Sequence, residues 1–289
     1  MRYASIHMAT AFEKDYWNNR LFFDCPRNND GLFNVFSLLR GKMLEYGVEL
    51  NTPDIERPVE FEVYIDGRSK VGDKKKYLLA LENPLINRYN GTPEYLAIFD
   101  KVFTSQKDIG IQLMYPSNIK FSEFNQDREM FSCMIASNKS GIQYEERRKV
   151  IDWYGDSKLF NLYGNGWTSP SWKGEIPYKK DVLENAVFCW CYENSQQENY
   201  ITEKIFDCFT TGCIPIYWGA PNVTDYIPSN CFIDRRNFDS ISSTHDYLLN
   251  ISKDEICEFQ ENIMKFLETD AYIFSDEHYA NEVARQICG

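Results

Sequence analysis

The sequence has little basic charge and no long apolar run. Of its 289 residues, 31 are Lys or Arg and 43 are Asp or Glu, so the formal net charge is −12. An excess of acidic groups repels nucleic-acid backbones and anionic lipid surfaces, so we expect neither as a partner. No apolar run reaches the roughly 18 residues of a membrane-spanning helix, and the first residues lack the apolar region of a signal peptide.

Histidine and regularly spaced cysteine are scarce as well. The three histidines, His7, His245 and His278, are scattered, and there is no Asp-x-Asp motif, so we predict no metal site in the protein. The nine cysteines are odd in number and irregularly spaced. In the absence of a secretion signal, we expect them to be reduced thiols and the protein to be cytoplasmic.

What the sequence does contain is an alternation of strand and helix patterns. Hydrophobic residues make up 43% and aromatic residues 16%, which is enough for folded cores. The alternation is interrupted by a polar stretch at 121–130 and then resumes. We therefore predict two α/β domains with parallel sheets, residues 1–125 and 126–289, facing each other across a cleft. The pattern leaves open whether the last helix packs back on the first domain.

The predicted elements follow from periodicity and from turn residues. In the first series we expect strands over Arg2–Met8, Pro58–Ile65, Lys76–Leu81, Leu96–Thr104 and Ile111–Tyr115, and a helix over Gly31–Tyr46. In the second series we expect strands over Phe131–Ala136, Phe160–Tyr163, Val187–Tyr192, Ile214–Trp218 and Cys231–Asp234. The helices of that series are expected over Glu145–Tyr154, Ile201–Thr211, Ile241–Leu249, Asp254–Leu267 and Glu277–Ile287.

Residues 192–219 form the most informative segment. A buried-type strand delivers the polar residues 193–195 at its carboxyl end, and a helix start follows after a polar loop. Tyr200, Glu203 and Lys204 are spaced to share one face of that predicted helix. A helix N-terminus with a lysine suits a phosphate, and a glutamate beside it can bind sugar hydroxyls. The pattern indicates a nucleotide-sugar site; a merely solvated helix start is the alternative.

This segment resembles the C-terminal motif of the α-1,3/1,4-fucosyltransferases, glycosyltransferase family 10. Three elements match in order and spacing, namely Glu193-Asn194-Ser195, Tyr200-Ile201-Thr202-Glu203-Lys204 and Ile214-Pro215-Ile216. The resemblance is strong over residues 131–240, weak over 60–130 and absent before that.

The resemblance continues upstream of that segment. Ser137 and Asn138, followed by a basic helix start, are similar to the family's Ser-Asn…Arg segment. Arg147 lies seventeen residues before Gly164, and this spacing favours Arg147 over the adjacent Arg148 as the family's phosphate-binding arginine. A surface charge on the helix is the alternative role for Arg147.

In the N-terminal half, Glu82-Asn83-Pro84 follows a predicted strand and resembles the family segment that carries the proposed general base. A carboxylate at the carboxyl end of a strand suits that role, because ligands bind at this edge of a parallel sheet. The alternative is a loop glutamate that caps a turn before the proline.

The resemblance implies a GT-B architecture of two Rossmann-like domains. It also implies inverting transfer of L-fucose from GDP-fucose to a hydroxyl of an oligosaccharide or polysaccharide acceptor, as in glycan biosynthesis or protein glycosylation. The implied catalytic residues are Glu82 and Glu203. The implied donor-binding residues are Ser137, Asn138, Arg147, Asn194, Tyr200, Glu203 and Lys204.

Several points stay open at the level of sequence. The implied mechanism neutralises the diphosphate with fixed cations and needs no tightly bound cofactor, but stimulation by a divalent metal held by the diphosphate itself stays open. The same fold could use another GDP-linked 6-deoxy sugar, or the chain could be a catalytically silent glycan- or nucleotide-binding module. Assembly into a homo-oligomer is also open.

Overall fold

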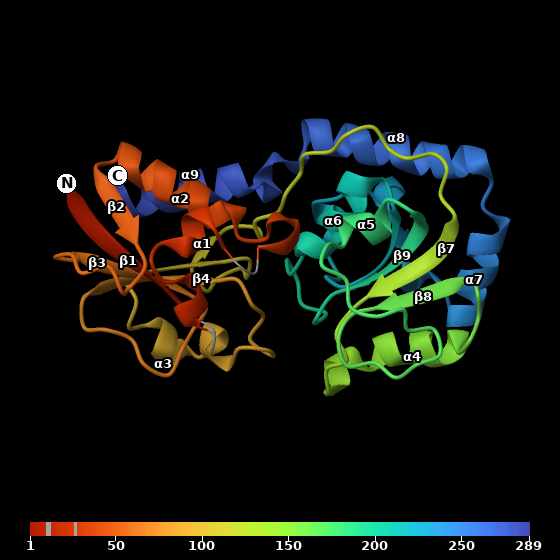
Figure 1. The fold of residues 1–289 in the computed structure, drawn as a ribbon, viewed down its shortest axis with the longest axis horizontal. Helices are drawn as coiled ribbons and strands as arrows, with labels where there is room; N and C mark the ends of the chain where they lie inside the picture. The colour runs from red at the N-terminus through yellow and green to blue at the C-terminus, as the bar shows by residue number, and fades with distance from the viewer. Residues whose placement is uncertain (10–12, 26–27) are drawn as a thin grey trace. The chain divides into compact units, whose positions relative to one another are not determined.

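The computed structural model describes residues 1–9, 13–25 and 28–289. The chain forms two compact units (Figure 1). One consists of Met1–Ser117 together with Ile273–Gly289, and the other consists of Asn118–Tyr272. Each unit contains one sheet of parallel strands, so the predicted α/β class with two Rossmann-like domains is confirmed. The sequence placed the boundary after residue 125, whereas the first unit ends at Ser117 and takes up the chain again at Ile273.

The sheet of the first unit has the strand order β2-β1-β3-β4-β5-β6. Its strands are β1 (Arg2–Met8), β2 (Val48–Asn51), β3 (Phe61–Ile65), β4 (Lys75–Ala80), β5 (Lys101–Thr104) and β6 (Ile111–Gln112). Its helices are α1 (Arg20–Phe23), α2 (Asn34–Glu45), α3 (Pro93–Leu96) and α9 (Asp276–Cys288). The direction of winding reverses between β1 and β3, which is the point where open parallel sheets bind ligands.

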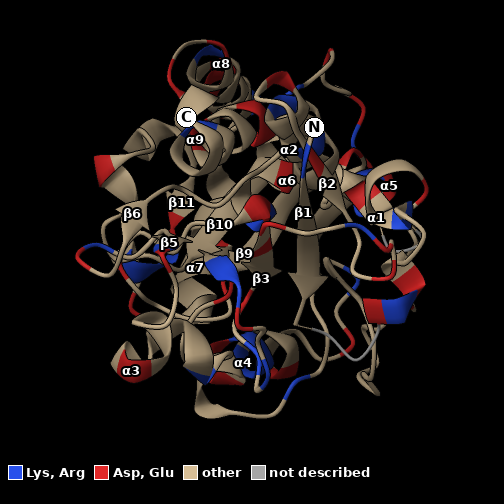
Figure 2. Ribbon diagram, turned by 90° about the vertical axis from the view of Figure 1, so that its left-hand side faces the viewer, with Lys and Arg blue, Asp and Glu red and all other residues tan. Residues whose placement is uncertain are grey.

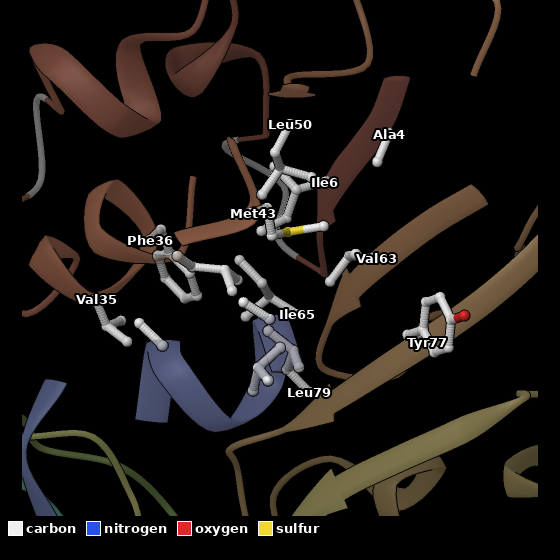
Figure 3. Packing of buried hydrophobic residues seen from close by; sticks show 14 of the residues in the cluster. Ala4, Ile6, Val35, Phe36, Met43, Leu50, Val63, Ile65, Tyr77 and Leu79 are labelled. Atoms are coloured by element: carbon white, nitrogen blue, oxygen red, sulfur yellow. The ribbon is translucent and has the colours of Figure 1, made fainter. Parts of the chain in front are cut away.

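The core of the first unit is built by residues from both ends of the chain. Figure 3 shows Phe36 and Met43 of α2 near Ile6 of β1 and Ile65 of β3, all in one buried cluster. Four residues of α9 belong to the same cluster, namely Tyr279, Ala280, Val283 and Ala284. Their spacing puts them on one face of the helix, which therefore packs against α2 and completes this core.

The sheet of the second unit has the strand order β11-β10-β9-β7-β8. Its strands are β7 (Met130–Ile135), β8 (Phe160–Tyr163), β9 (Ala186–Tyr192), β10 (Ile214–Trp218) and β11 (Ile233–Asp234). Its helices are α4 (Glu145–Tyr154), α5 (Lys180–Leu183), α6 (Glu203–Thr211), α7 (Ile241–Asn250) and α8 (Lys253–Thr269). In this sheet the direction of winding reverses between β7 and β9, and this position is the switch point of the sheet.

Most predicted elements are present, and the differences have local causes. The strand predicted over Leu96–Thr104 is wrong in its first part, because Pro93 starts the short helix α3 and the strand begins only at Lys101. The four-residue strand β2 was not predicted, since it directly follows Gly47 and is too short to show a period.

Acidic and basic residues are interspersed along the ribbon in Figure 2.

Among the residues that the structure describes, none of the helices combines the length and the apolar character needed to cross a membrane.

Candidate functional site

A cavity of about 280 Å³ opens in the second unit at the switch point of its sheet. Ala136 and Ser137, which follow β7, line it together with Tyr192, the last residue of β9, and Asn194, which follows that strand. The carboxyl ends of neighbouring parallel strands meet here, where the fold leaves room for a ligand.

Arg147 contributes a buried positive charge to the cavity wall. It lies in the first turn of α4 and is 5% exposed. Its Nη2 donates to the carbonyl oxygen of Tyr192 at 2.6 Å and to Oδ1 of Asn194 at 3.0 Å, and its guanidinium lies 5.1 Å from the ring centroid of Tyr144. Burial lowers the pKa of Arg147 below its usual value, and the charge of Glu193 offsets part of that effect. A guanidinium titrates so high that the side chain stays charged at neutral pH.

A carboxylate joins the end of β9 to the start of α6. The side chain of Glu193 is fully buried, and its Oε1 accepts the backbone N–H of Thr202 at 2.8 Å. Its Oε2 accepts the hydroxyl of Thr202 at 2.8 Å and lies 3.2 Å from Nζ of Lys204. Glu193 thus fixes both ends of the intervening loop. The sequence pattern included this residue but did not assign it a role in the site.

Lys204 lies between two carboxylates at the cavity. Its Nζ is 3.2 Å from Oε2 of Glu193 and 3.4 Å from Oε1 of Glu203, and it donates to the hydroxyl of Thr202 at 2.8 Å. Burial disfavours the charged ammonium, but attraction by the two carboxylates outweighs it and raises the pKa of Lys204 above its usual value. The cavity therefore holds a second fixed cation.

Glu203 and Asp207 lie one turn apart on α6 and share Lys179. Nζ of Lys179 is 2.7 Å from Oδ2 of Asp207 and 3.6 Å from Oε1 of Glu203. Burial acts to raise the pKa of Glu203, but the charges of Lys204 and Lys179 outweigh it and lower that pKa below its usual value. Glu203 is therefore ionised and can only accept hydrogen bonds.

Sequence reasoning missed Lys179 and Asp207, which also line the cavity. Asp207 follows Glu203 by four residues, and this spacing on a helix is a signal that could have identified it. Lys179 precedes α5 in a stretch with no periodic pattern, so no sequence signal was available for it.

Five of the seven predicted donor-binding residues line this cavity, namely Ser137, Arg147, Asn194, Glu203 and Lys204. Of the adjacent arginine pair, Arg147 faces the cavity, whereas Arg148 donates to the carbonyl of Lys139.

Asn138 and Tyr200 are not among the lining residues. The Asn138 side chain instead donates to the carbonyl of Gly166 at 2.9 Å. The prediction that Tyr200 shares a helix face with Glu203 is wrong, because α6 begins at Glu203 and Thr202 before it has an extended backbone. Tyr200 is buried ahead of the helix.

Glu82, the predicted base, lies in the first unit directly after β4 and Leu81. Its side chain is half-buried, and Oε1 accepts the backbone N–H of Asn83 at 3.0 Å. The carboxyl edge of β4 is the position that the sequence indicated for it.

The described residues hold no group of three or more His, Cys, Asp or Glu side chains placed to bind a metal ion. All nine cysteines are free thiols.

Gly164 directly follows β8 and lines the cavity. A substitution at Gly164 tests whether the end of β8 must lie close to Ala136, which follows β7. The φ of Gly164 is +117°, and a Cβ atom there would lie 2.2 Å from the carbonyl oxygen of Ala136. We expect Gly164→Ala to lower the free energy of unfolding by about 2 kcal/mol or more, because it adds a backbone clash to an unfavourable φ. Urea unfolding measures this loss.

Gly174 provides the matched control. Its φ of +112° is similar, but nothing lies within 4 Å of an added Cβ. Gly174→Ala should therefore cost only the conformational part, about 1 kcal/mol. Equal losses in the two variants would contradict the role of close approach at Gly164.

Comparison with known proteins identifies the family. The family model described as "Glycosyltransferase family 10 (fucosyltransferase) C-term" matches residues 125–284, which is more than half of the chain. This stretch includes every residue named above as lining the cavity.

Curated relatives carry fucosyltransferase names. The 4-galactosyl-N-acetylglucosaminide 3-alpha-L-fucosyltransferase 9 of Rattus norvegicus is 27% identical over 216 residues, covering 68% of this chain and 57% of that protein. The Alpha-(1,3)-fucosyltransferase FucT of Helicobacter pylori is 32% identical over 104 residues, covering 35% of this chain and 22% of that protein. The chain thus spans little more than half the length of the first of these relatives.

Solved structures show the same fold. A crystal structure of an alpha1,3-fucosyltransferase with GDP-fucose matches with a TM-score of 0.65 at 17% identity, covering 100% of this chain and 90% of that chain. An alpha-glucosyltransferase in complex with UDP and DNA matches with a TM-score of 0.60 at 10% identity, covering 99% and 98%. The likeness to the fucosyltransferase confirms the expected GT-B class of fold. With the family model matching more than half of its residues, the chain belongs to glycosyltransferase family 10, the fucosyltransferase family.

Proposed function

We propose that this chain transfers L-fucose from GDP-fucose to a hydroxyl of a glycan acceptor, with inversion at the anomeric carbon. The observation that carries the proposal is the cavity of the second unit, where two fixed cations, Arg147 and Lys204, lie at the switch point of a parallel sheet. A diphosphate needs such cations, both for binding and for holding the charge that develops as it leaves.

Different residues of the cavity would bind different parts of the donor. Arg147 and Lys204 would contact the diphosphate, because both are held charged within the wall. Glu203, which is ionised, would accept hydrogen bonds from hydroxyls of the sugar or ribose. The start of α6 contributes less to phosphate binding than the sequence suggested, since the N–H of Thr202 already donates a hydrogen bond to Glu193. The fixed side-chain charges are therefore the main phosphate ligands in this proposal.

The chemical step is a single displacement. The acceptor hydroxyl gives its proton to the carboxylate of Glu82 while its oxygen bonds to the anomeric carbon from the face opposite to GDP. The bond between that carbon and the diphosphate oxygen breaks, and GDP leaves with the electron pair. Its added negative charge is stabilised by Arg147 and Lys204. One displacement inverts the configuration.

Calorimetric titration tests the donor. We expect GDP-fucose to bind more tightly than GDP-mannose, and UDP-glucose to bind far more weakly. Equal affinities for GDP, GDP-fucose and GDP-mannose would favour a different GDP-linked 6-deoxy sugar as the donor. Nucleotide binding without turnover on any acceptor would indicate a catalytically silent module. The first acceptor to test is a 4-galactosyl-N-acetylglucosaminide, the substrate in the name of the rat relative.

We expect transfer to continue when divalent metal is removed. Arg147 and Lys204 can supply the positive charge that a metal ion supplies in other transferases. Turnover in excess EDTA should stay within about tenfold of turnover in Mg²⁺. A metal ion held by the diphosphate itself would account for a decrease of that size. Complete loss in EDTA, restored by Mg²⁺, would contradict this expectation.

We also propose that the protein works in a reducing compartment such as the cytoplasm. The support is that all nine cysteines are free thiols. Fractionation of the native host, with the protein followed by antibody, tests this proposal. Recovery in an oxidising compartment would contradict it.

A further inference from the structure

The backbone around Glu82 is held by two side chains that the proposed mechanism does not use. Oδ1 of Asp66 accepts the backbone N–H groups of Leu81 at 2.9 Å and of Glu82 at 2.8 Å. Nδ2 of Asn90 donates to the carbonyl oxygen of Glu82 at 2.8 Å. Both backbone polar groups of Glu82 are thus bound, and the peptide cannot rotate without breaking one of these bonds.

Asp66 and Asn90 are also bound to each other. Nδ2 of Asn90 donates to the same Oδ1 of Asp66 at 2.7 Å, and Oδ1 of Asn90 accepts the N–H of Gly67 at 2.8 Å. Asn90 is fully buried. Asp66 has a φ of 60°, an uncommon conformation for a residue other than glycine, and this turn carries its carboxylate from the end of β3 to the end of β4.

We infer that Asp66 is a positioning residue for Glu82, and that the negative charge of Asp66 is needed for the full rate of transfer. This inference rests on the proposed role of Glu82 as the base. A carboxylate that accepts three hydrogen bonds on one oxygen holds its donors more firmly than a neutral acceptor does, because charge-assisted bonds are roughly twice as strong. Protonation of Asp66 would loosen the peptide that carries the base.

The surroundings of Asp66 bring its titration close to neutral pH. Burial raises the pKa of Asp66 to about 6, and the nearby charge of Glu82 adds to this rise, while the three hydrogen bonds oppose it. The buried hydroxyl of Tyr279, from α9, also lies within electrostatic range, and burial raises the pKa of that group above its usual value. The guanidinium of Arg68, two residues along, is bound instead by Glu13.

The sign of the pH effect differs between activity and stability. A raised carboxyl pKa means that the native state prefers the protonated form, so this group stabilises the fold below its unfolded pKa and loses that contribution as pH rises through about 6. Activity has the opposite sign, since it needs the ionised form. At neutral pH the ionised carboxylate of Asp66 would therefore lower the stability of the fold while it supports turnover.

Asp66→Asn and Asp66→Ala separate charge from geometry. An asparagine at this position keeps an oxygen for the two backbone N–H groups but carries no charge, whereas alanine removes both. We expect Asp66→Asn to lower the kcat of transfer about tenfold and to move the acid limb of its pH profile below pH 6. It should melt no lower than the wild type above pH 7. Asp66→Ala should lower kcat about a hundredfold.

The readouts distinguish this inference from its alternatives. The affinity for GDP-fucose should be unchanged in both variants, because the donor cavity belongs to the other unit. An unchanged acid limb in Asp66→Asn would overturn the charge requirement, and a normal kcat in Asp66→Ala would overturn the positioning role. If Glu82→Gln is itself fully active, it is the proposed base that fails, whatever Asp66 does.

Discussion

Replacing Glu82 by glutamine is expected to lower the kcat of fucosyl transfer by about 10²- to 10⁴-fold, the range of general base catalysis. Glutamine retains an oxygen for the N–H of Asn83 and has nearly the same shape, so the backbone after β4 should stay in place. The amide cannot take the acceptor proton. The loss should therefore appear in kcat, with the affinity for GDP-fucose unchanged by calorimetry.

Glu94→Gln is the matched control for this prediction. Glu94 is an exposed glutamate in the first turn of α3, in the same unit as Glu82. Its replacement should leave kcat as it is. A Glu82→Gln variant that turns over as fast as Glu94→Gln would show that the base lies elsewhere.

Lys204→Met is expected to have the largest effect on donor binding. Loss of a charge-assisted contact to the diphosphate should raise the Kd for GDP-fucose by roughly 10- to 150-fold, equivalent to about 1.5–3 kcal/mol. The same change leaves the fully buried carboxylate of Glu193 without its cation, so the free energy of unfolding should fall by about 3 kcal/mol. Calorimetry and urea unfolding measure the two effects separately.

A second substitution distinguishes binding from folding. Adding Glu193→Gln to Lys204→Met removes the uncompensated buried charge and should restore much of the stability but none of the affinity. Lys149→Met, at an exposed lysine of α4, is the control and should change neither. If affinity returned together with stability in the double variant, Lys204 would be a structural residue and not a phosphate ligand.

The sequence predicted the site best where a functional residue directly follows a strand or lies in the first turn of a helix. Asn194 follows the buried strand β9 and Lys204 lies in the first turn of α6, so local patterns placed both at the edge of a sheet. Arg147, in the first turn of α4, was identified by the resemblance to the family and not by a local pattern. The start of α6 was predicted two residues early. Thr202 is held by the carboxylate of Glu193, nine residues back, and a partner at that distance leaves no mark on helical periodicity.

The supporting contacts were harder to predict because they join separate elements. Asp66-Gly67 reads as an ordinary turn after a strand, and nothing local indicates that Asp66 binds the backbone 15 and 16 residues further on. Lys179 likewise meets Asp207 only after α5 and α6 have packed. Such residues become visible only once the order of the strands is known.

The return of α9 to the first unit determines when that unit can fold on the ribosome. Domains commonly fold in the order of their synthesis, the N-terminal one first. Here the second unit is one continuous segment, Asn118–Tyr272, whereas the core of the first unit is closed by Tyr279, Val283 and their neighbours in α9, which follows that segment. The second unit can therefore finish folding first, and Asp66 and Tyr279 come together only after α9 has been made. A ribosome that stops before α9 releases a chain in which the proposed donor cavity can form while the unit carrying Glu82 lacks part of its core.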